Sequence, residues 1–338
     1  MRATKTIVLT ASILIAWSIV IGVVAQADRA AQLDQSDRHD RPTAFSPPAE
    51  AHTQAFSVSA GSPITSTGLS AADVLGTASG PVIACEDLGL LCGAGEDVRG
   101  LSYGYDFASP NLPPIQFSVV KGSRGIIGTA VRIEADCALA EPEADVFETV
   151  LNGANDQDLD GNGTACGTNA GFGLGLTEGA YGDNVDEIER DPCLTIDANC
   201  DGMPDEPVYV TLAPGSPTLS EIAATAADIL IASPDLPPQV WASRAQLGLT
   251  TGDVIDALCV QDNGDATYGA TDRVLFSLAA GSPSLAKWAA SPADALRPQY
   301  GVMYAAGKLG LLATDDVDGL ACSSDVQFAT LYLPLIRK

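Results

Sequence analysis

Four ordered copies of one set of short sequence elements occupy most of the chain beyond residue 54, and this repetition limits the possible folds more than any other feature. The first element joins an aromatic residue to a Gly-Ser turn, as in Phe56-Ser-Val-Ser-Ala-Gly-Ser-Pro. Its other copies begin at Phe117, Tyr209 and Phe276. Because the order of the elements is the same each time, the repeat indicates one supersecondary unit that is used four times.

Three further elements follow the first one in every copy. An Ala-Asp pair with aliphatic neighbours comes first, at residues 72, 144, 227 and 293. A Leu-Gly-Leu triplet follows, at residues 88, 174, 247 and 309. The last element is Asp97-Val-Arg-Gly-Leu, Asn184-Val-Asp-Glu-Ile, Asp253-Val-Ile-Asp-Ala-Leu and Asp316-Val-Asp-Gly-Leu.

Each element has the character of a short strand or a turn. Phe-Ser-Val alternates apolar and polar residues as a half-buried strand does. Gly-Ser-Pro ends this strand, because proline cannot donate to a sheet and glycine permits turn dihedral angles. The Asp-Val element fits a second strand that pairs as a hairpin with the next Phe-Ser strand, and Leu-Gly-Leu fits a turn with an apolar anchor on either side. The sequence therefore predicts a mainly β fold with few helices.

The copies divide the chain into units of about 55–110, 111–204, 205–270 and 271–325, with residues 326–336 as a closing strand. A unit of about 60 residues with three or four short antiparallel strands matches a propeller blade in size. We therefore predict a single domain over residues 55–338 in which the four units close into a β-propeller-like toroid. A β-sandwich and a linear array of sheets are the alternatives.

The N-terminal segment predicts export. A short basic region precedes an uncharged apolar run over residues 7–25, and Ala25-Gln-Ala places small residues where a signal peptidase cleaves. Residues 1–27 are thus a predicted signal peptide, with a retained membrane anchor as the alternative. Residues 28–54 are polar without an apolar period and predict a disordered spacer. We expect a secreted or cell-surface protein with no membrane span after cleavage.

The cysteines and the charge add two constraints. All eight cysteines lie beyond the predicted signal peptide, and an even number in an exported chain favours disulfides. Cys85 and Cys92 are spaced for a local loop, as are Cys193 and Cys200, whereas the other pairings stay open. The formal net charge of -26 would repel nucleic acid. Both histidines precede the repeats, which excludes Ser-His-Asp and Cys-His catalysis in the folded body.

Two Asp-rich insertions are candidate calcium loops. Both read Asp-x-Asp/Asn-x-Asp-Gly, a spacing that brings three oxygen-bearing side chains to one ion, and calcium takes about six to eight oxygen ligands. The loops resemble those of thrombospondin type 3 repeats and dockerins. The likeness to an EF-hand is limited, because Gly167 and Val208 stand where its bidentate Glu would be. The predicted Ca²⁺ ligands are Asp156, Asp158, Asp160 and Asn162 in the first loop, and Asp197, Asn199, Asp201 and Asp205 in the second.

Further acids recur beside the Asp-Val strands. They are Asp183 and Asp186, Asp253 and Asp256, and Asp315, Asp316 and Asp318. Their recurrence with valine and leucine favours a role in capping turns, and ion binding is the alternative.

The pattern of the units resembles repeat segments of exported bacterial proteins over most of residues 55–325, and the resemblance implies no activity. We expect a non-enzymatic, calcium-stabilised and disulfide-braced protein that binds an unknown protein or glycan partner or forms part of the cell surface. We assign no catalytic residue. The alternative is a secreted glycoside hydrolase that uses paired carboxylates. Its candidate acids are Glu86, Asp87, Glu134 and Asp136, with Trp241 and Trp288 as sugar-stacking platforms.

Overall fold

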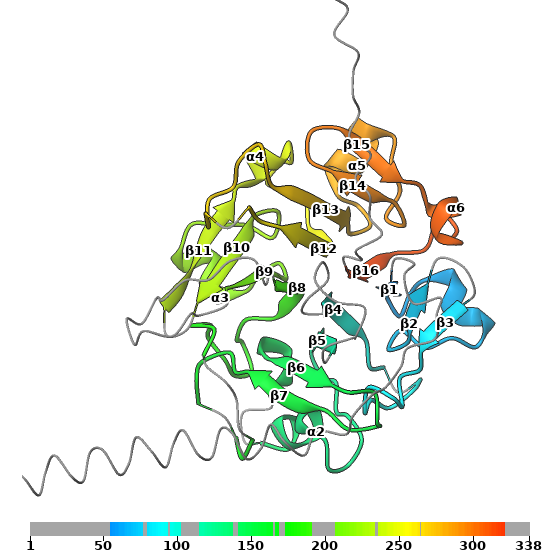
Figure 1. Ribbon diagram of the computed structural model, residues 1–338, viewed down its shortest axis with the longest axis vertical. Helices are drawn as coiled ribbons and strands as arrows, with labels where there is room; N and C mark the ends of the chain where they lie inside the picture. The colour runs from blue at the N-terminus through cyan, green and yellow to red at the C-terminus, as the bar shows by residue number, and fades with distance from the viewer. Residues whose placement is uncertain are drawn as a thin grey trace, which may run out of the picture. The chain divides into compact units, whose positions relative to one another are not determined.

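The structure is a computed structural model (Figure 1). It describes residues 55–76, 80–93, 95–102, 115–137, 141–164, 166–168, 173–190, 207–233, 236–263 and 265–321. The predicted signal peptide, the spacer, the closing strand at 326–336 and the second calcium loop at Asp197–Asp205 fall outside these residues.

The described strands form four antiparallel sheets of four strands each. The first sheet, in the order β16-β1-β2-β3, contains β1 (Ala55–Val58), β2 (Val74–Gly76), β3 (Gly80–Ile83) and β16 (Val317–Leu320). The second contains β4 (Val98–Ser102), β5 (Ile115–Val119), β6 (Val146–Thr149) and β7 (Asp156–Leu159). The third contains β8 (Val185–Arg190), β9 (Val208–Leu212), β10 (Ile229–Ser233) and β11 (Leu236–Ala242). The fourth contains β12 (Ile255–Gln261), β13 (Arg273–Leu278), β14 (Ala295–Arg297) and β15 (Gly301–Tyr304).

The four sheets are the blades of a β-propeller, so the predicted toroid is confirmed. The inner strands β16, β4, β8 and β12 follow one another around the centre of Figure 1, and each contacts the next, including β12 with β16. The ring closes in blade 1, where β16 pairs with β1 and Leu320 lies opposite Phe56. β1, the first strand of the domain, thus pairs with the last described strand.

The blades are offset by one strand from the units seen in the sequence. A unit begins with its Phe-Ser strand, whereas blades 2, 3 and 4 begin with the preceding Asp-Val strand, which pairs with the Phe-Ser strand as predicted. In blade 1 the two strands of this pair come from opposite ends of the domain. This overlap of first and last strands fastens the ring.

Hydrophobic cores fill the spaces between neighbouring blades. Phe56, Phe117 and Phe276 are almost completely buried, and Phe117 and Phe276 pair with leucines of the adjacent inner strands. In blade 3 this position belongs to Val210, which pairs with Ile188. Tyr209 therefore points to the other face of the sheet, since side chains alternate along a strand. Its ring packs 4.8 Å from that of Trp241.

The turns follow the predicted chemistry. The central glycines of the Leu-Gly-Leu triplets all have positive φ (76°, 71°, 82° and 79° at residues 89, 175, 248 and 310), and all eight leucines are buried. Gly-Ser-Pro does more than end a strand, because its proline opens a short helix, as proline does at a first helical position. The helices that begin this way are η1 (Pro63–Thr67), α3 (Pro217–Glu221) and α5 (Pro283–Trp288).

Four other short helices complete the described elements. They are α2 (Ala130–Ala135), η2 (Pro142–Ala144), α4 (Arg244–Leu247) and α6 (Ala306–Leu309). None of the helices in the described ranges has the length and apolar character needed to cross a bilayer.

Candidate functional site

One group of recurring acids caps the turns at the ends of the inner strands, as predicted. Asp253 accepts hydrogen bonds from the backbone nitrogens of Thr250 and Ser284, at 2.6 and 2.8 Å, and from both hydroxyls. Burial raises the pKa of Asp253, but these hydrogen bonds lower it by more, so the pKa lies below its usual value. Asp183 and Asp315 accept equivalent pairs of backbone hydrogen bonds, and Glu96 does the same in blade 2. Each cap joins two turns of one blade.

A second group of acids converges on the axis of the ring. Two residues after the start of the Asp-Val element lie Arg99, Asp186 and Asp318, and Asp256 lies three residues after the start of its element. Nη1 of Arg99 lies 3.3 Å from Oδ1 of Asp186 and 3.4 Å from Oδ1 of Asp256. Arg99 of blade 2 thus binds carboxylates of blades 3 and 4. We call Arg99, Asp97, Asp186, Asp256, Asp316 and Asp318 the axial cluster.

The axial cluster holds more carboxyls than its arginine neutralises. Asp318 is fully buried and neither of its oxygens accepts a hydrogen bond. Burial raises the pKa of Asp97 to about 7 and that of Asp186 to about 6, with Arg99 opposing both shifts. Burial also raises the pKa of Asp256 and Asp318 well above the usual range. Among the described residues, the axis brings no three carboxylate oxygens from different side chains within 4.8 Å of one another.

The compact group of acids lies in blade 2. Asp145, Asp160 and Glu178 each bring one carboxylate oxygen within 4.8 Å of the other two. Asp145 directly precedes β6, Asp160 directly follows β7, and Glu178 lies on the segment that follows Leu-Gly-Leu. Asp145 and Asp160 are almost completely buried and Glu178 is half-buried. We call these three residues, together with Glu141, the blade 2 cluster.

Glu141 completes the blade 2 cluster from the start of η2. It is 8 % exposed, its Oε1 has no hydrogen-bond partner, and it is hydrogen-bonded to Glu178. Burial, Glu141 and the charges of Asp145 and Asp160 together raise the pKa of Glu178 to about 10. Burial also raises the pKa of Asp145 well above its usual value. Burial and the neighbouring carboxyls thus favour the protonated form of Asp145 and Glu178.

The described donors to the blade 2 cluster are neutral. Backbone nitrogens of Gly161, Asn162 and Thr164 donate to Asp145, Glu178 and Asp160 at 2.9, 2.7 and 2.8 Å. The side chain of Asn162 also donates to Glu178. A Cβ at Gly161 would lie 2.6 Å from Oε1 of Glu178. The glycine of the Asp-x-Asp-Gly motif therefore makes room for a carboxylate.

The structure brings only part of the first predicted calcium loop to this cluster. Asp160 is a member, and Asn162 binds Glu178. Asp156 and Asp158 lie on strand β7, whose extended backbone carries them away from Asp160. Asp158 accepts from Arg190 at 3.0 Å. Calcium binding by the four predicted residues of this loop stays a prediction, as does calcium binding by the second loop.

The members of the blade 2 cluster that we did not predict are Glu141, Asp145 and Glu178. Asp145 belongs to the recurring Ala-Asp pair, whose other copies accept two backbone hydrogen bonds as turn caps, as Asp228 does from Thr225 and Arg244. Asp145 has one such donor, Gly161. Asp145 differs from the other copies because the insertion of blade 2 folds against it, and the sequence alone does not show this contact.

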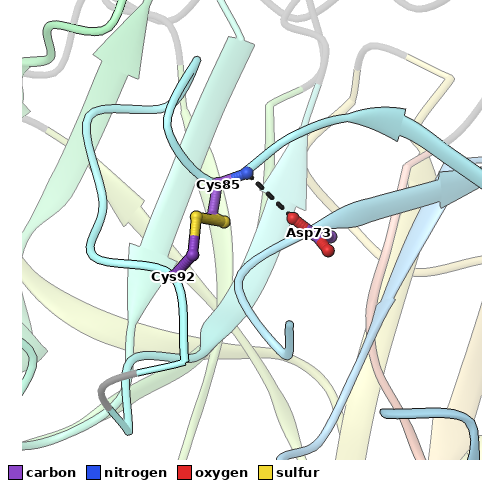
Figure 2. Close-up of side chains that lie close together, drawn as sticks. All are labelled: Asp73, Cys85 and Cys92. Atoms are coloured by element: carbon purple, nitrogen blue, oxygen red, sulfur yellow. Dashed lines mark hydrogen bonds between the residues drawn. A yellow bond between two sulfur atoms is a disulfide. The ribbon is translucent and has the colours of Figure 1, made fainter. Parts of the chain in front are cut away.

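Two other groups of acids and cysteines have the composition of metal sites but contain disulfides. Figure 2 shows Asp73 beside the disulfide Cys85–Cys92, with the backbone nitrogen of Cys85 donating to its carboxylate at 2.9 Å. Asp73 is thus the turn cap of blade 1. The predicted local loop between these cysteines is confirmed.

The second group contains Glu134 and the disulfide Cys137–Cys166. Cys259 on β12 is also disulfide-bonded. The pair Cys193 and Cys200 lies outside the described residues.

The carboxylates and the tryptophans considered for a glycoside hydrolase lie on different blades. Glu134 lies in the helix of blade 2, and Asp136 is paired with Arg124 and Arg132. Glu86 and Asp87 lie in the turn after β3. Trp241 and Trp288 belong to the core between blades 3 and 4.

Comparison of the chain with protein-family models, with curated proteins and with solved structures finds no match. The fold and the candidate site therefore rest on the geometry of this chain.

Proposed function

We propose that this protein is an exported, calcium-stabilised and disulfide-braced β-propeller that serves as a binding or structural protein at the cell surface. The blade 2 cluster carries the calcium proposal, because Asp145, Asp160 and Glu178 bring three carboxylate oxygens within 4.8 Å of one another. Glu141 is hydrogen-bonded to Glu178, and the described donors beside the cluster are neutral. A donor set made of oxygens suits calcium better than zinc, which takes nitrogen and sulfur ligands in most protein sites.

Several features support export and a role other than catalysis. Structural disulfides form and persist in oxidising compartments, and the sequence before the repeats has the composition of a signal peptide. The repeats contain no histidine. The acids that we considered for glycoside hydrolysis are dispersed over blades 1 and 2, away from the tryptophans of blades 3 and 4. A ring of four blades suits a rigid support for binding surfaces.

The calcium proposal predicts that chelator lowers the melting temperature and that added calcium restores it. At a calcium concentration ten times the dissociation constant, one site adds about 1.4 kcal/mol, which is about 3 °C for a domain of this size. The measurement is thermal unfolding in chelator and in calcium, with terbium luminescence as a direct report of binding. An unchanged melting curve in excess chelator would contradict the proposal.

Two variants separate the blade 2 cluster from the predicted loop. Glu178→Gln should remove most of the calcium-dependent shift. In chelator it should melt at or above the wild-type temperature, because it removes one of the crowded carboxyls. Asp156→Asn is the matched control, since Asp156 is exposed and lies outside the cluster. It should keep the full calcium response.

A further inference from the structure

A pocket of about 420 Å³ opens on the outer side of blades 3 and 4. It lies where helix α4, the turn between β14 and β15, and the connection from β12 to β13 meet. We call it the rim pocket. The residues that carry its chemistry are Gln246, Tyr268, Asp272, Arg297, Gln299 and Tyr300.

The turn between β14 and β15 is held rigidly against blade 3. The backbone nitrogen of Gln299 donates to the carbonyl of Leu247 at 3.1 Å, and its side-chain amide donates to the carbonyl of Gln246 at 2.8 Å. Gln299 has φ 64°, a left-handed conformation that favours glycine. Backbone strain of this kind gathers at binding sites, where the surrounding structure enforces it.

This turn presents an aromatic ring to solvent. Tyr300 is 80 % exposed although its backbone is fixed by the neighbouring Gln299. The guanidinium of Arg297 lies 5.0 Å from the centre of the Tyr300 ring. Arg297 forms no ion pair with another described residue. One side of the rim pocket therefore combines an open aromatic face with a cation whose donors are available.

The opposite wall is equally rigid. The ring of Tyr268 meets that of Trp241 edge-on at 5.1 Å, and the indole nitrogen of Trp241 donates to Asp262 at 3.0 Å. Burial and the charge of Asp272 raise the pKa of Tyr268, so its hydroxyl stays protonated at neutral pH. Asp272 accepts from the backbone nitrogens of Gly269 and Asn263 at 2.5 and 3.1 Å. These side chains are placed before a ligand arrives.

We propose that the rim pocket binds a neutral saccharide of one or two pyranose rings, an inference that rests on the binding role proposed above and names its ligand class. Pockets of this volume enclose drug-sized molecules and fix them with a few polar groups. A pyranose has an apolar face that can lie on the ring of Tyr300. Its hydroxyls match the mixed donors and acceptors of Gln246, Asp272 and Arg297. A neutral ligand also avoids repulsion by a chain of net charge -26.

The rim pocket is built for binding and not for cleavage of a glycosidic bond. Hydrolysis by retention or inversion uses two carboxyl groups on either side of the scissile bond. Asp272 is the only acid among the residues that line the pocket in the described part of the chain.

The test uses the full mature chain in calcium-containing buffer on an array of neutral and acidic oligosaccharides, followed by titration of the strongest neutral glycan. Tryptophan fluorescence is a suitable signal, because Trp241 packs behind Tyr268. We expect Tyr300→Ala to weaken binding about tenfold. Tyr268→Phe, which keeps the ring and removes the hydroxyl, should weaken it about threefold.

Tyr181→Ala is the matched control, because Tyr181 is 93 % exposed and does not line the rim pocket. It should bind as the wild type does. Three outcomes would overturn the proposal: no neutral saccharide binds, only acidic glycans bind, or Tyr300→Ala binds as well as Tyr181→Ala. Release of shortened sugar on incubation would overturn the exclusion of cleavage. The melting temperature with and without calcium is measured on the same samples. If saccharide binding fails but the calcium dependence is present, the saccharide inference is wrong and the proposed calcium-stabilised protein is still supported.

Discussion

Asp253 and Asp256 lie three residues apart at one inner strand, yet their carboxyls behave in opposite ways. Both are shielded from solvent, with exposed fractions of 1 % and 4 %. Hydrogen bonds from Thr250 and Ser284 outweigh burial at Asp253 and lower its pKa. At Asp256, burial together with Asp186 and Asp316 raises the pKa well above the usual range although Arg99 opposes the shift. Backbone donors thus decide whether a buried carboxylate stabilises this ring.

The same contrast recurs in blade 1. Asp315 accepts from the backbone nitrogens of Ile64 and Leu312, at 2.8 and 2.7 Å. Asp318, three residues later, has no donor to either oxygen. One short motif therefore carries two kinds of acid. The first kind stabilises the turns of each blade, and the second lies at the axis without such donors, where burial raises its pKa.

The largest expected effect is the loss of a capping carboxylate. Asp253→Asn leaves donors of two turns facing an amide NH₂, so we expect the free energy of unfolding to fall by about 4 kcal/mol, since hydrogen bonds to charged groups contribute about 1.5–3 kcal/mol each. Asp318→Asn replaces a buried carboxyl that accepts no hydrogen bond and whose pKa is raised well above the usual range, so its cost should be below about 1 kcal/mol. Urea unfolding at pH 7 in calcium measures both. Equal losses in the two variants would refute the distinction between caps and axial acids.

Removal of the axial arginine should have the next largest effect. Arg99→Gln leaves Asp186 and Asp256 without their shared cation, and breaking a buried ion pair costs about 3 kcal/mol. The loss should shrink at pH 5, where protons neutralise more of the axial cluster. Arg124→Gln is the control, because its ion pair with Asp136 is exposed to solvent and surface ion pairs contribute little to stability. A loss that does not change between pH 7 and pH 5 would contradict this account of the axis.

The smallest expected effect is a change in the pH dependence of stability. The pKa of Asp186 is about 6 in the folded protein against an ordinary 3.8, so the folded state binds its proton more tightly. Its contribution to stability is therefore full below about pH 4 and is lost as the pH rises through about 6. Five neighbouring acids also have raised pKa values and take up protons in the folded state, whereas the charge of Arg99 opposes this uptake. They are Asp97, Asp256, Asp316, Asp318 and Glu187.

Asp186→Asn should reduce the loss of stability between pH 4 and pH 6 by about 2 kcal/mol. The readout is the slope of unfolding free energy against pH, which is independent of any constant cost of the substitution. Asp253 should act in the opposite sense, because its lowered pKa gives stability that is lost as the pH falls below its ordinary value. A variant slope equal to that of the wild type would show that Asp186 holds no proton in this range.

Much of the architecture was predictable because it is local and repeated. The alternating Phe-Ser strands, the apolar anchors of Leu-Gly-Leu and the pairing of Asp-Val with Phe-Ser strands all depend on neighbouring residues. In blade 3 the aromatic residue of the repeat does not occupy the position that its counterparts occupy in the other blades. Val210 takes the position that Phe117 holds in blade 2, and Tyr209 faces the other way. Strand pairing decides the face of each side chain, and sequence letters alone do not show it.

The candidate site was only partly predictable. Asp160 and Asn162 were found from their spacing, but Asp156 and Asp158 follow an extended strand. Asp145 and Glu178 are separated from Asp160 by 15 and 18 residues and meet it only because the insertion of blade 2 folds back on its own sheet. Residues that are this far apart in the sequence leave no local pattern to show that they meet, whereas the residues of a short motif do.

The sequence alone determined that four equivalent units exist, that their Phe-Ser and Asp-Val segments form strands, that Leu-Gly-Leu forms a turn, and that one cysteine pair closes a local loop. These properties follow from periodicity and turn chemistry, which act over a few residues. Only the tertiary structure decided that the ring closes by pairing β16 with β1, and which acids receive donors. Those outcomes depend on contacts between strands far apart in the chain, because the free energy of a buried charge is set by everything packed around it.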